Sequence, residues 1–251
     1  MRALYWKEIR SFLGSTIGYI FILIFLITSG VIHWYISGEA NLLEGAEADL
    51  IPFFNASPWI FLVLIPAITM RSIAEERRNG TIELLFTRPI TDLKIILAKY
   101  FAGVTLLVIS LLPTLVYYYS MSQLGINPVG EDGTETTVID EGAMLTSYFG
   151  LVLLGSAFVA IGIFASSITS SQIVAFILGM FICLFMYYGL ELIGSFNLMG
   201  EYDVIFRYIG ITSHYESIMR GVIDTEDMLY FFGLIAVFIT AALTVVKSLK
   251  R

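Results

Sequence analysis

The residue types that support enzyme chemistry are few in this chain and lie far apart. His33 and His214 have no metal-ligand spacing to each other or to a carboxylate, so we interpret both as interfacial residues. The serines at 166–171 have no nearby histidine or lysine that would activate a nucleophile. The single cysteine, Cys183, lies in an apolar run and excludes an intramolecular disulfide. The sequence predicts no catalytic residue, no metal site and no cofactor in this chain.

Phosphate binding and proton transfer are also disfavoured by the sequence. No stretch fits the GxxxxGK[ST] pattern that cradles nucleotide phosphates. Ion-coupled carriers need ionisable groups near the middle of the membrane, but Arg71 and Glu191 fall near the ends of apolar runs. Glu191 either faces a cavity or reaches the outer interface. A secondary carrier or a proton relay is therefore a disfavoured interpretation.

The most distinctive polar stretch is the charged insert at 75–92, which separates two apolar runs. Asn79 and Gly80 predict a turn, because both residue types tolerate positive φ. Thr81 is the predicted N-cap of a helix of about two turns that ends before Pro89. One side of this helix is apolar and the other polar: Ile82, Leu85 and Phe86 against Glu83 and Thr87. Such a helix suits docking into a groove of a soluble partner, and the alternative is an ordinary solvated loop.

Composition indicates that lipid is the main solvent of the chain. Of 251 residues 57% are hydrophobic and 14% are charged, and the mean hydropathy is +0.84. A hydrocarbon layer of about 30 Å needs about 20 helical residues per crossing. The sequence predicts an all-α polytopic membrane protein, one transmembrane domain over 1–251 with six transmembrane helices. The predicted spans are 17–36, 53–73, 93–120, 145–168, 173–193 and 228–246.

Two further segments are amphipathic and do not fit a simple span. Residues 1–16 combine basic and aromatic side chains, which is typical of a helix in the membrane interface. Residues 195–227 are too polar to span and too apolar for a free loop, and they predict partly inserted helices. Pro66 and Pro113 predict bends inside spans. Small residues such as Gly155 and Gly162 allow close helix contact, either within one chain or between two copies.

Charge asymmetry predicts the orientation. With six spans, one side of the membrane holds both termini and the charged insert, and all of the 14 basic residues except Arg207 and Arg220. The same side holds only five of the 21 acidic residues: Glu8, Glu75, Glu76, Glu83 and Asp92. Basic residues concentrate on the cytoplasmic side of membrane proteins. We therefore expect both termini and the insert to be cytoplasmic.

Several stretches resemble a known family. The insert at 76–85 (ERRNGTIELL), followed by Pro89-Ile90, resembles the first cytoplasmic loop of the ABC-2 type permeases, the membrane subunits of ABC exporters. The segment 7–12 (KEIRSF) resembles their amphipathic elbow helix. The segments 213–217 (SHYES) and 220–224 (RGVID), with Asp227, resemble the branch of gliding-motility-associated ABC transporter permeases. The resemblance extends over essentially the whole chain.

The resemblance implies an assembly with defined contacts. The insert would be a coupling helix seated in a separate ABC ATP-binding subunit, which would hold ATP and magnesium. The implied docking residues are Glu76, Gly80, Thr81, Ile82, Glu83, Leu85 and Phe86. Residues 195–227 would form an outer re-entrant hairpin. The candidate outer-gate residues there and at the end of the fifth span are Glu191, His214, Arg220 and Asp224.

The resemblance also implies partners and a location. A second permease copy, as a homodimer, and an accessory periplasmic or membrane-anchored gliding protein would complete the assembly in the bacterial inner membrane, with no role for nucleic acid. A continuous helix from the second span into 73–78 would transmit motion, aided by Arg71–Glu75 and Glu75–Arg78 pairs. The alternative is a membrane scaffold that anchors an ATPase complex for motility or envelope assembly and passes no substrate.

Overall fold

The computed structural model describes residues 1–38, 41–43, 50–86, 90–124, 141–196, 200 and 203–250, and within these not the side chains of 17, 84–86, 124, 141 and 203–205. Every regular element in these ranges is helical, which confirms the predicted all-α class. The α-helices are α1 (Arg2–Leu13), α2 (Thr16–Trp34), α3 (Ile51–Thr69), α4 (Ala74–Arg78), α5 (Thr81–Phe86), α6 (Asp92–Leu111), α7 (Leu115–Leu124), α8 (Glu141–Ile168), α9 (Gln172–Leu184), α10 (Leu190–Ser195), α11 (Asp203–Ile209), α12 (Ile211–Met219) and α13 (Thr225–Ser248).

Five helical stretches are long and apolar enough to cross a membrane, and the bent pair of α1 and α2 makes a sixth. The five are Ile51–Arg78, Asp92–Gln123, Gly142–Ile168, Gln172–Ser195 and Thr225–Ser248. Together they correspond to the six predicted apolar runs. The bend between α1 and α2 is 60°, so the amphipathic start of the chain turns away from the first span.

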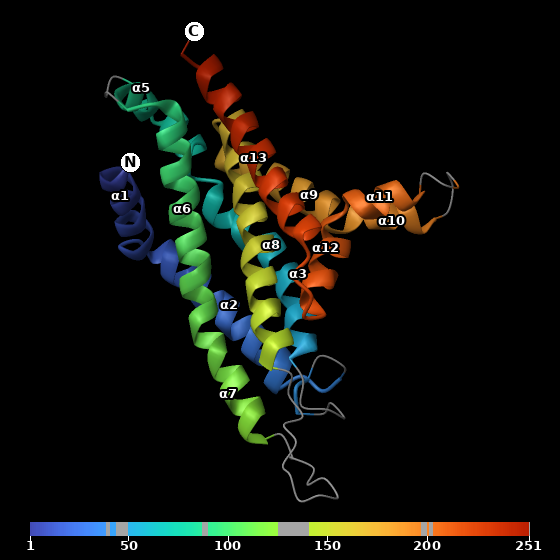
Figure 1. Ribbon diagram of the computed structural model, residues 1–251. Helices are drawn as coiled ribbons and strands as arrows, with labels where there is room; N and C mark the ends of the chain where they lie inside the picture. The colour runs from blue at the N-terminus through green and yellow to red at the C-terminus, as the bar shows by residue number, and fades with distance from the viewer. Residues whose placement is uncertain are drawn as a thin grey trace, which may run out of the picture.

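Helix α8 is the centre of the bundle (Figure 1). Of its most apolar window 83% is buried, against 22% for α13. A Cβ on Gly155 would lie 2.4 Å from Leu107 Cδ2, and one on Gly162 would lie 2.0 Å from Thr69 Oγ1. These glycines therefore let α6 and α3 approach α8 within one chain, so close packing inside the chain accounts for the spacing.

Two spans carry irregular turns. A 3₁₀ turn at Leu112–Thr114 contains Pro113 and joins α6 to α7, where the sequence predicts a bend. A π-helical turn at Phe185–Gly189 separates α9 from α10, which the sequence did not predict. The Thr212 hydroxyl on α12 donates to the Tyr187 carbonyl in this π turn, so a neighbouring helix satisfies a backbone group there. Beyond it, α10 and α11 lie side by side and extend away from the bundle (Figure 1).

Both termini and α5 lie toward the same end of the molecule (Figure 1). Lys250 near the C-terminus forms an ion pair with Asp92 at the start of α6, with Nζ and Oδ1 2.5 Å apart. Residues 125–140, between α7 and α8, lie outside the described residues. An even number of crossings follows from this arrangement.

Candidate functional site

One polar cluster joins α1, α4 and α6, and we call it the elbow cluster: Lys7, Glu8, Glu76 and Lys99. The Lys99 Nζ lies 2.8 Å from Glu76 Oε1 and 3.3 Å from Glu8 Oε1. The Lys99 side chain is only 2% exposed, whereas that of Lys7 is 60% exposed. A buried ammonium is tolerated when carboxylates pair with it. The elbow cluster therefore holds α4 against α1 and α6 by charge.

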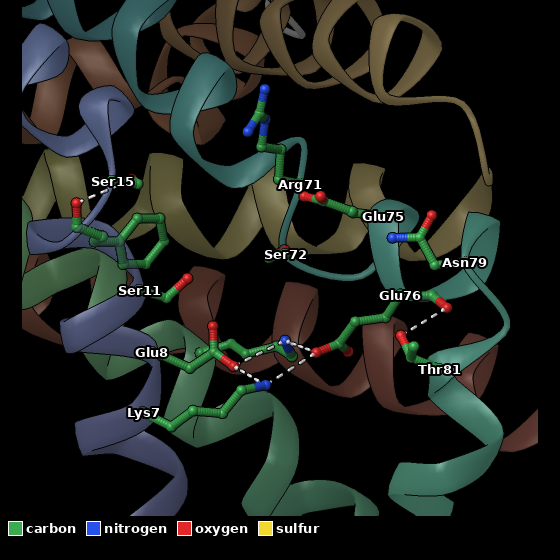
Figure 2. Close-up of a pocket in the computed structure, with 12 residues that line it drawn as sticks. Lys7, Glu8, Ser11, Ser15, Arg71, Ser72, Glu75, Glu76, Asn79 and Thr81 are labelled. Atoms are coloured by element: carbon green, nitrogen blue, oxygen red, sulfur yellow. Dashed lines mark hydrogen bonds and ion pairs between the residues drawn. The ribbon is translucent and has the colours of Figure 1, made fainter.

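A cavity of about 380 Å³ lies beside the elbow cluster. Figure 2 shows Lys7, Glu8 and Glu76 pointing toward one another, while Arg71 extends away from them. In the described structure neither Arg71 nor Glu75 takes part in an ion pair, so the expected Arg71–Glu75 and Glu75–Arg78 pairs do not form. The acidic residue of α4 that is paired is Glu76.

A second contact fastens α4 and the turn before it to α8, and we call it the serine clamp: Ser166 and Arg77. Ser166 Oγ accepts hydrogen bonds from the Ile73 and Ala74 N–H groups, each at 3.0 Å, and donates to the Met70 carbonyl at 3.0 Å. Arg77 Nη1 donates to the Ser167 carbonyl at 2.6 Å. Helix α3 ends at Thr69 and α4 begins at Ala74, so a turn at 70–73 interrupts the predicted continuous helix, although Ile51–Arg78 remains one candidate span. The backbone groups freed by the turn at 70–73 are satisfied by α8 instead.

The predicted docking residues occupy different environments. Gly80 has φ +69°, as expected for the turn, and α5 begins at Thr81. The Thr81 hydroxyl donates to the Glu76 carbonyl at 3.3 Å. Ile82 is 9% exposed and packs in the chain's own core, whereas Glu83 is exposed. The side chains of Leu85 and Phe86 lie outside those that the structure describes.

A third polar site, the histidine cluster, joins α11, α12 and α13 through Tyr208, His214, Asp227 and Tyr230. The His214 Nδ1 lies 2.6 Å from Asp227 Oδ1, and its Nε2 lies 2.8 Å from the Tyr208 carbonyl oxygen. The ring stacks on Tyr230 with centroids 3.9 Å apart. His214 and Asp227 are 4% and 5% exposed. The cluster therefore buries two titratable groups in direct contact.

Side chains also cap the end of α11. The last carbonyls of an α-helix lack partners within it. Ser213 donates to the Arg207 carbonyl at 2.9 Å, and the Tyr230 hydroxyl donates to the Ile209 carbonyl at 2.6 Å. Arg207 itself donates to the Gly194 carbonyl at the end of α10, from Nε at 3.1 Å and Nη2 at 3.0 Å. The pair of helices α10 and α11 is thus tied to α12 and α13.

The structure does not bring the four predicted outer-gate residues together. Only His214 lies in the histidine cluster. Arg220 is exposed, and its Nε donates to the Glu216 carbonyl at 3.2 Å. Asp224 is exposed and caps α13, its Oδ1 accepting from the Thr225 N–H at 2.7 Å. Glu191 is half-buried on α10.

Sequence reasoning missed the pairing of His214 with Asp227. A usable signal was present, since the two residues flank the short connection between α12 and α13. The Glu226 carboxylate accepts a hydrogen bond from the Tyr208 hydroxyl and raises the pKa of that phenol. Acidic groups therefore gather at the start of α13. Within the described residues, no group of three or more His, Cys, Asp or Glu side chains is placed to hold a metal ion.

Comparison with known families gives one match that extends over nearly the whole chain. A family model described as ABC-2 family transporter protein matches residues 2–248. No curated protein was found to match the chain.

Proposed function

The chain belongs to the ABC-2 family of transporter proteins, and from that premise we propose that α4 and α5 couple a separate ATP-binding subunit to movement of the bundle. The family makes the chain a multi-pass membrane permease subunit of an ABC transporter and implies an ABC ATP-binding partner. ATP and magnesium would be held by that partner. The chain supplies the membrane path and the docking element.

The serine clamp is the observation that supports this coupling. It joins the coupling segment directly to α8, which packs against α3, α6, α9, α12 and α13. A push on α5 reaches α4, and the bonds of Ser166 and Arg77 pass it to the central helix. The elbow cluster carries the same displacement to α1 and α6. Motion at one short helix thus acts on most of the bundle.

The orientation and the biological setting belong to the same proposal. Both termini and α5 share the end where basic residues are concentrated, which supports a cytoplasmic position for that end in the bacterial inner membrane. Of the five long spans, Gln172–Ser195 and α13 are the least buried, with 28% and 22% of their apolar windows covered, and these surfaces suit a second copy. The resemblance at 213–217 and 220–224 supports an exporter linked to gliding motility, with an accessory gliding protein as a further partner.

The burial of α8 at the centre of the bundle, 83% over its apolar window, favours a substrate path between two copies over a path through a single copy. The same packing also fits the scaffold alternative, in which the complex anchors an ATPase and passes no substrate. The two differ in one measurable respect. A permease changes the transbilayer distribution of its substrate when ATP is supplied, whereas a scaffold hydrolyses ATP without such a change.

The docking proposal is tested by purifying the tagged chain in mild detergent from its native membranes and identifying its partners by mass spectrometry. Phe86→Asp should remove a stoichiometric ATP-binding subunit without reducing membrane insertion, because the charge disrupts an apolar contact. The matched control is Tyr35→Asp, the same change at a side chain 84% exposed at the far end of α2. An ATP-binding subunit retained with Phe86→Asp, or lost equally with Tyr35→Asp, would contradict the docking assignment.

A further inference from the structure

Each ring nitrogen of His214 faces an oxygen that accepts hydrogen bonds. The Tyr208 carbonyl oxygen only accepts, so Nε2 at 2.8 Å must carry a hydrogen. A neutral imidazole protonated at Nε2 has a bare lone pair on Nδ1. An ionised Asp227 offers only acceptors, so two lone pairs would face each other across 2.6 Å. A proton must therefore lie between Nδ1 and Oδ1.

We propose that His214 and Asp227 form a proton-binding site that fastens α11 to α12 and α13. The site holds one proton more than a neutral imidazole beside a carboxylate. The proton resides either on the ring, giving an imidazolium and a carboxylate, or on Asp227, giving two neutral groups. The pair has no net charge in both cases, and both hydrogen bonds are made.

The surroundings favour retention of this proton. Both residues are at least nine-tenths buried, and a buried site tolerates a pair without net charge far better than a lone carboxylate. Asp227 Oδ2 has no hydrogen-bond partner among the described residues, so nothing there stabilises an isolated charge. The acceptor for Nε2 is a carbonyl near the C-terminal end of α11, where positive charge is stabilised.

The ionisable groups around the pair act in the same direction. They are Tyr208 on α11, Glu226 and Tyr230 on α13, and Asp224, which caps α13. The two carboxylates add negative potential, which favours a bound proton. The stacked Tyr230 ring, with its centroid 3.9 Å from that of His214, favours a cationic imidazole. Arg220, the nearest cation in the sequence, donates instead to the Glu216 carbonyl of α12, and Arg207 donates to the Gly194 carbonyl of α10.

Loss of the proton changes the position of α10 and α11. Without it, one of the two contacts of His214 becomes a repulsion between lone pairs, so the ring leaves either Asp227 or the Tyr208 carbonyl. The end of α11 then loses one of its three side-chain caps. The placement of α11 against α12 and α13 is thereby linked to proton binding. This inference goes beyond the proposed function and does not depend on ATPase docking.

Nuclear magnetic resonance of the full chain in lipid nanodiscs tests the protonation state directly. The chain has only two histidines, and His33→Gln or His214→Gln assigns the ring signals. At about pH 7.5 an unperturbed imidazole is about one-tenth charged. We expect His214 to carry a hydrogen on Nε2 and a second proton on either Nδ1 or the Asp227 carboxyl. A bare Nε2, or a ring protonated only at Nε2 beside an ionised Asp227, would overturn the proposal.

The variant Asp227→Asn separates proton binding from mere packing. An asparagine amide donates to Nδ1 of a neutral ring and keeps the Nε2 bond without the extra proton. In hydrogen–deuterium exchange corrected for intrinsic rates, we expect α11 and α12 of the natural chain to exchange several-fold faster at about pH 9.5 than at about pH 7.5. Asp227→Asn should lack this increase. Equal pH responses in both chains would overturn the proposal, and the resonance experiment decides it if the variant does not fold.

Discussion

The elbow cluster and the histidine cluster both bury charge where three helices meet, and they differ in the kind of charge. In the elbow cluster, the Lys99 ammonium is shared by Glu8 and Glu76. An ammonium keeps its proton at neutral pH, whereas an imidazole is the side chain that titrates there. The elbow cluster therefore keeps its charges at neutral pH, which suits a contact that transmits motion from α4. In the proposed site the contacts of the histidine cluster change with protonation, which suits a contact that lets α11 change its position.

The largest effect expected on this comparison comes from Lys99→Met. It removes the buried cation shared by two carboxylates that are 11% and 17% exposed and leaves them only the exposed Lys7 ammonium, and breaking such a buried pair costs about 3–5 kcal/mol. Thermal unfolding of the detergent-solubilised chain measures this loss. Lys7→Met is the control, because the exposed Lys7 ammonium contributes less than about 1 kcal/mol. Equal losses in the two variants would show that Lys99 does not hold the joint.

A smaller loss is expected from Ser166→Ala in the serine clamp. The buried Ile73 and Ala74 N–H groups lose their acceptor, and an unsatisfied buried donor costs about 1–3 kcal/mol. Ser167→Ala is the matched control, since its hydroxyl bonds only the Phe164 carbonyl within α8. We expect Ser166→Ala to retain the ATP-binding subunit but uncouple ATP hydrolysis from transport. Loss of the subunit itself would place the clamp in docking rather than in transmission.

Tyr230→Phe tests the neutral part of the histidine cluster. It removes the hydrogen bond to the Ile209 carbonyl and keeps the ring that stacks on His214. A neutral hydrogen bond contributes about 1 kcal/mol, so we expect a modest loss in unfolding free energy and faster amide exchange at the end of α11. Tyr19→Phe, at an exposed position on α2, should change neither. Faster exchange in α1 instead of α11 would contradict the independence of the two clusters.

The smallest effect is expected at the ion pair between Lys250 and Asp92. The Lys250 side chain is 36% exposed, so Lys250→Met should cost less than about 1 kcal/mol. Salt screens exposed pairs far more than buried ones. We therefore expect high salt to abolish the loss in unfolding free energy that Lys250→Met causes at low salt. The loss caused by Lys99→Met should be the same at both salt concentrations. A salt-sensitive Lys99→Met would show that water reaches the elbow cluster.

The class of the molecule follows from the amino-acid sequence alone. Continuous apolar runs specify membrane helices because each run must satisfy its own backbone hydrogen bonds in lipid. That constraint is local, so the sequence alone predicts the spans and distinguishes the amphipathic segment at 195–227 from them. Gly80 marked its turn for the same reason, since a positive φ is a property of one residue.

Which polar residues meet depends on how the helices pack. Glu8, Glu76 and Lys99 come from three helices, and Ser166 bonds a turn more than 90 residues away in the chain. Periodicity describes one helix at a time, so it carries no information on which face of a neighbour it meets. The predicted pair of Arg71 with Glu75 rested on spacing within one helix, and it does not form. The ion pair that α4 does make is non-local, between Glu76 and the buried Lys99 of α6. The joint of His214 with Asp227 exists for the same reason, because helix packing brings together an acid and a base that the sequence alone leaves unpaired.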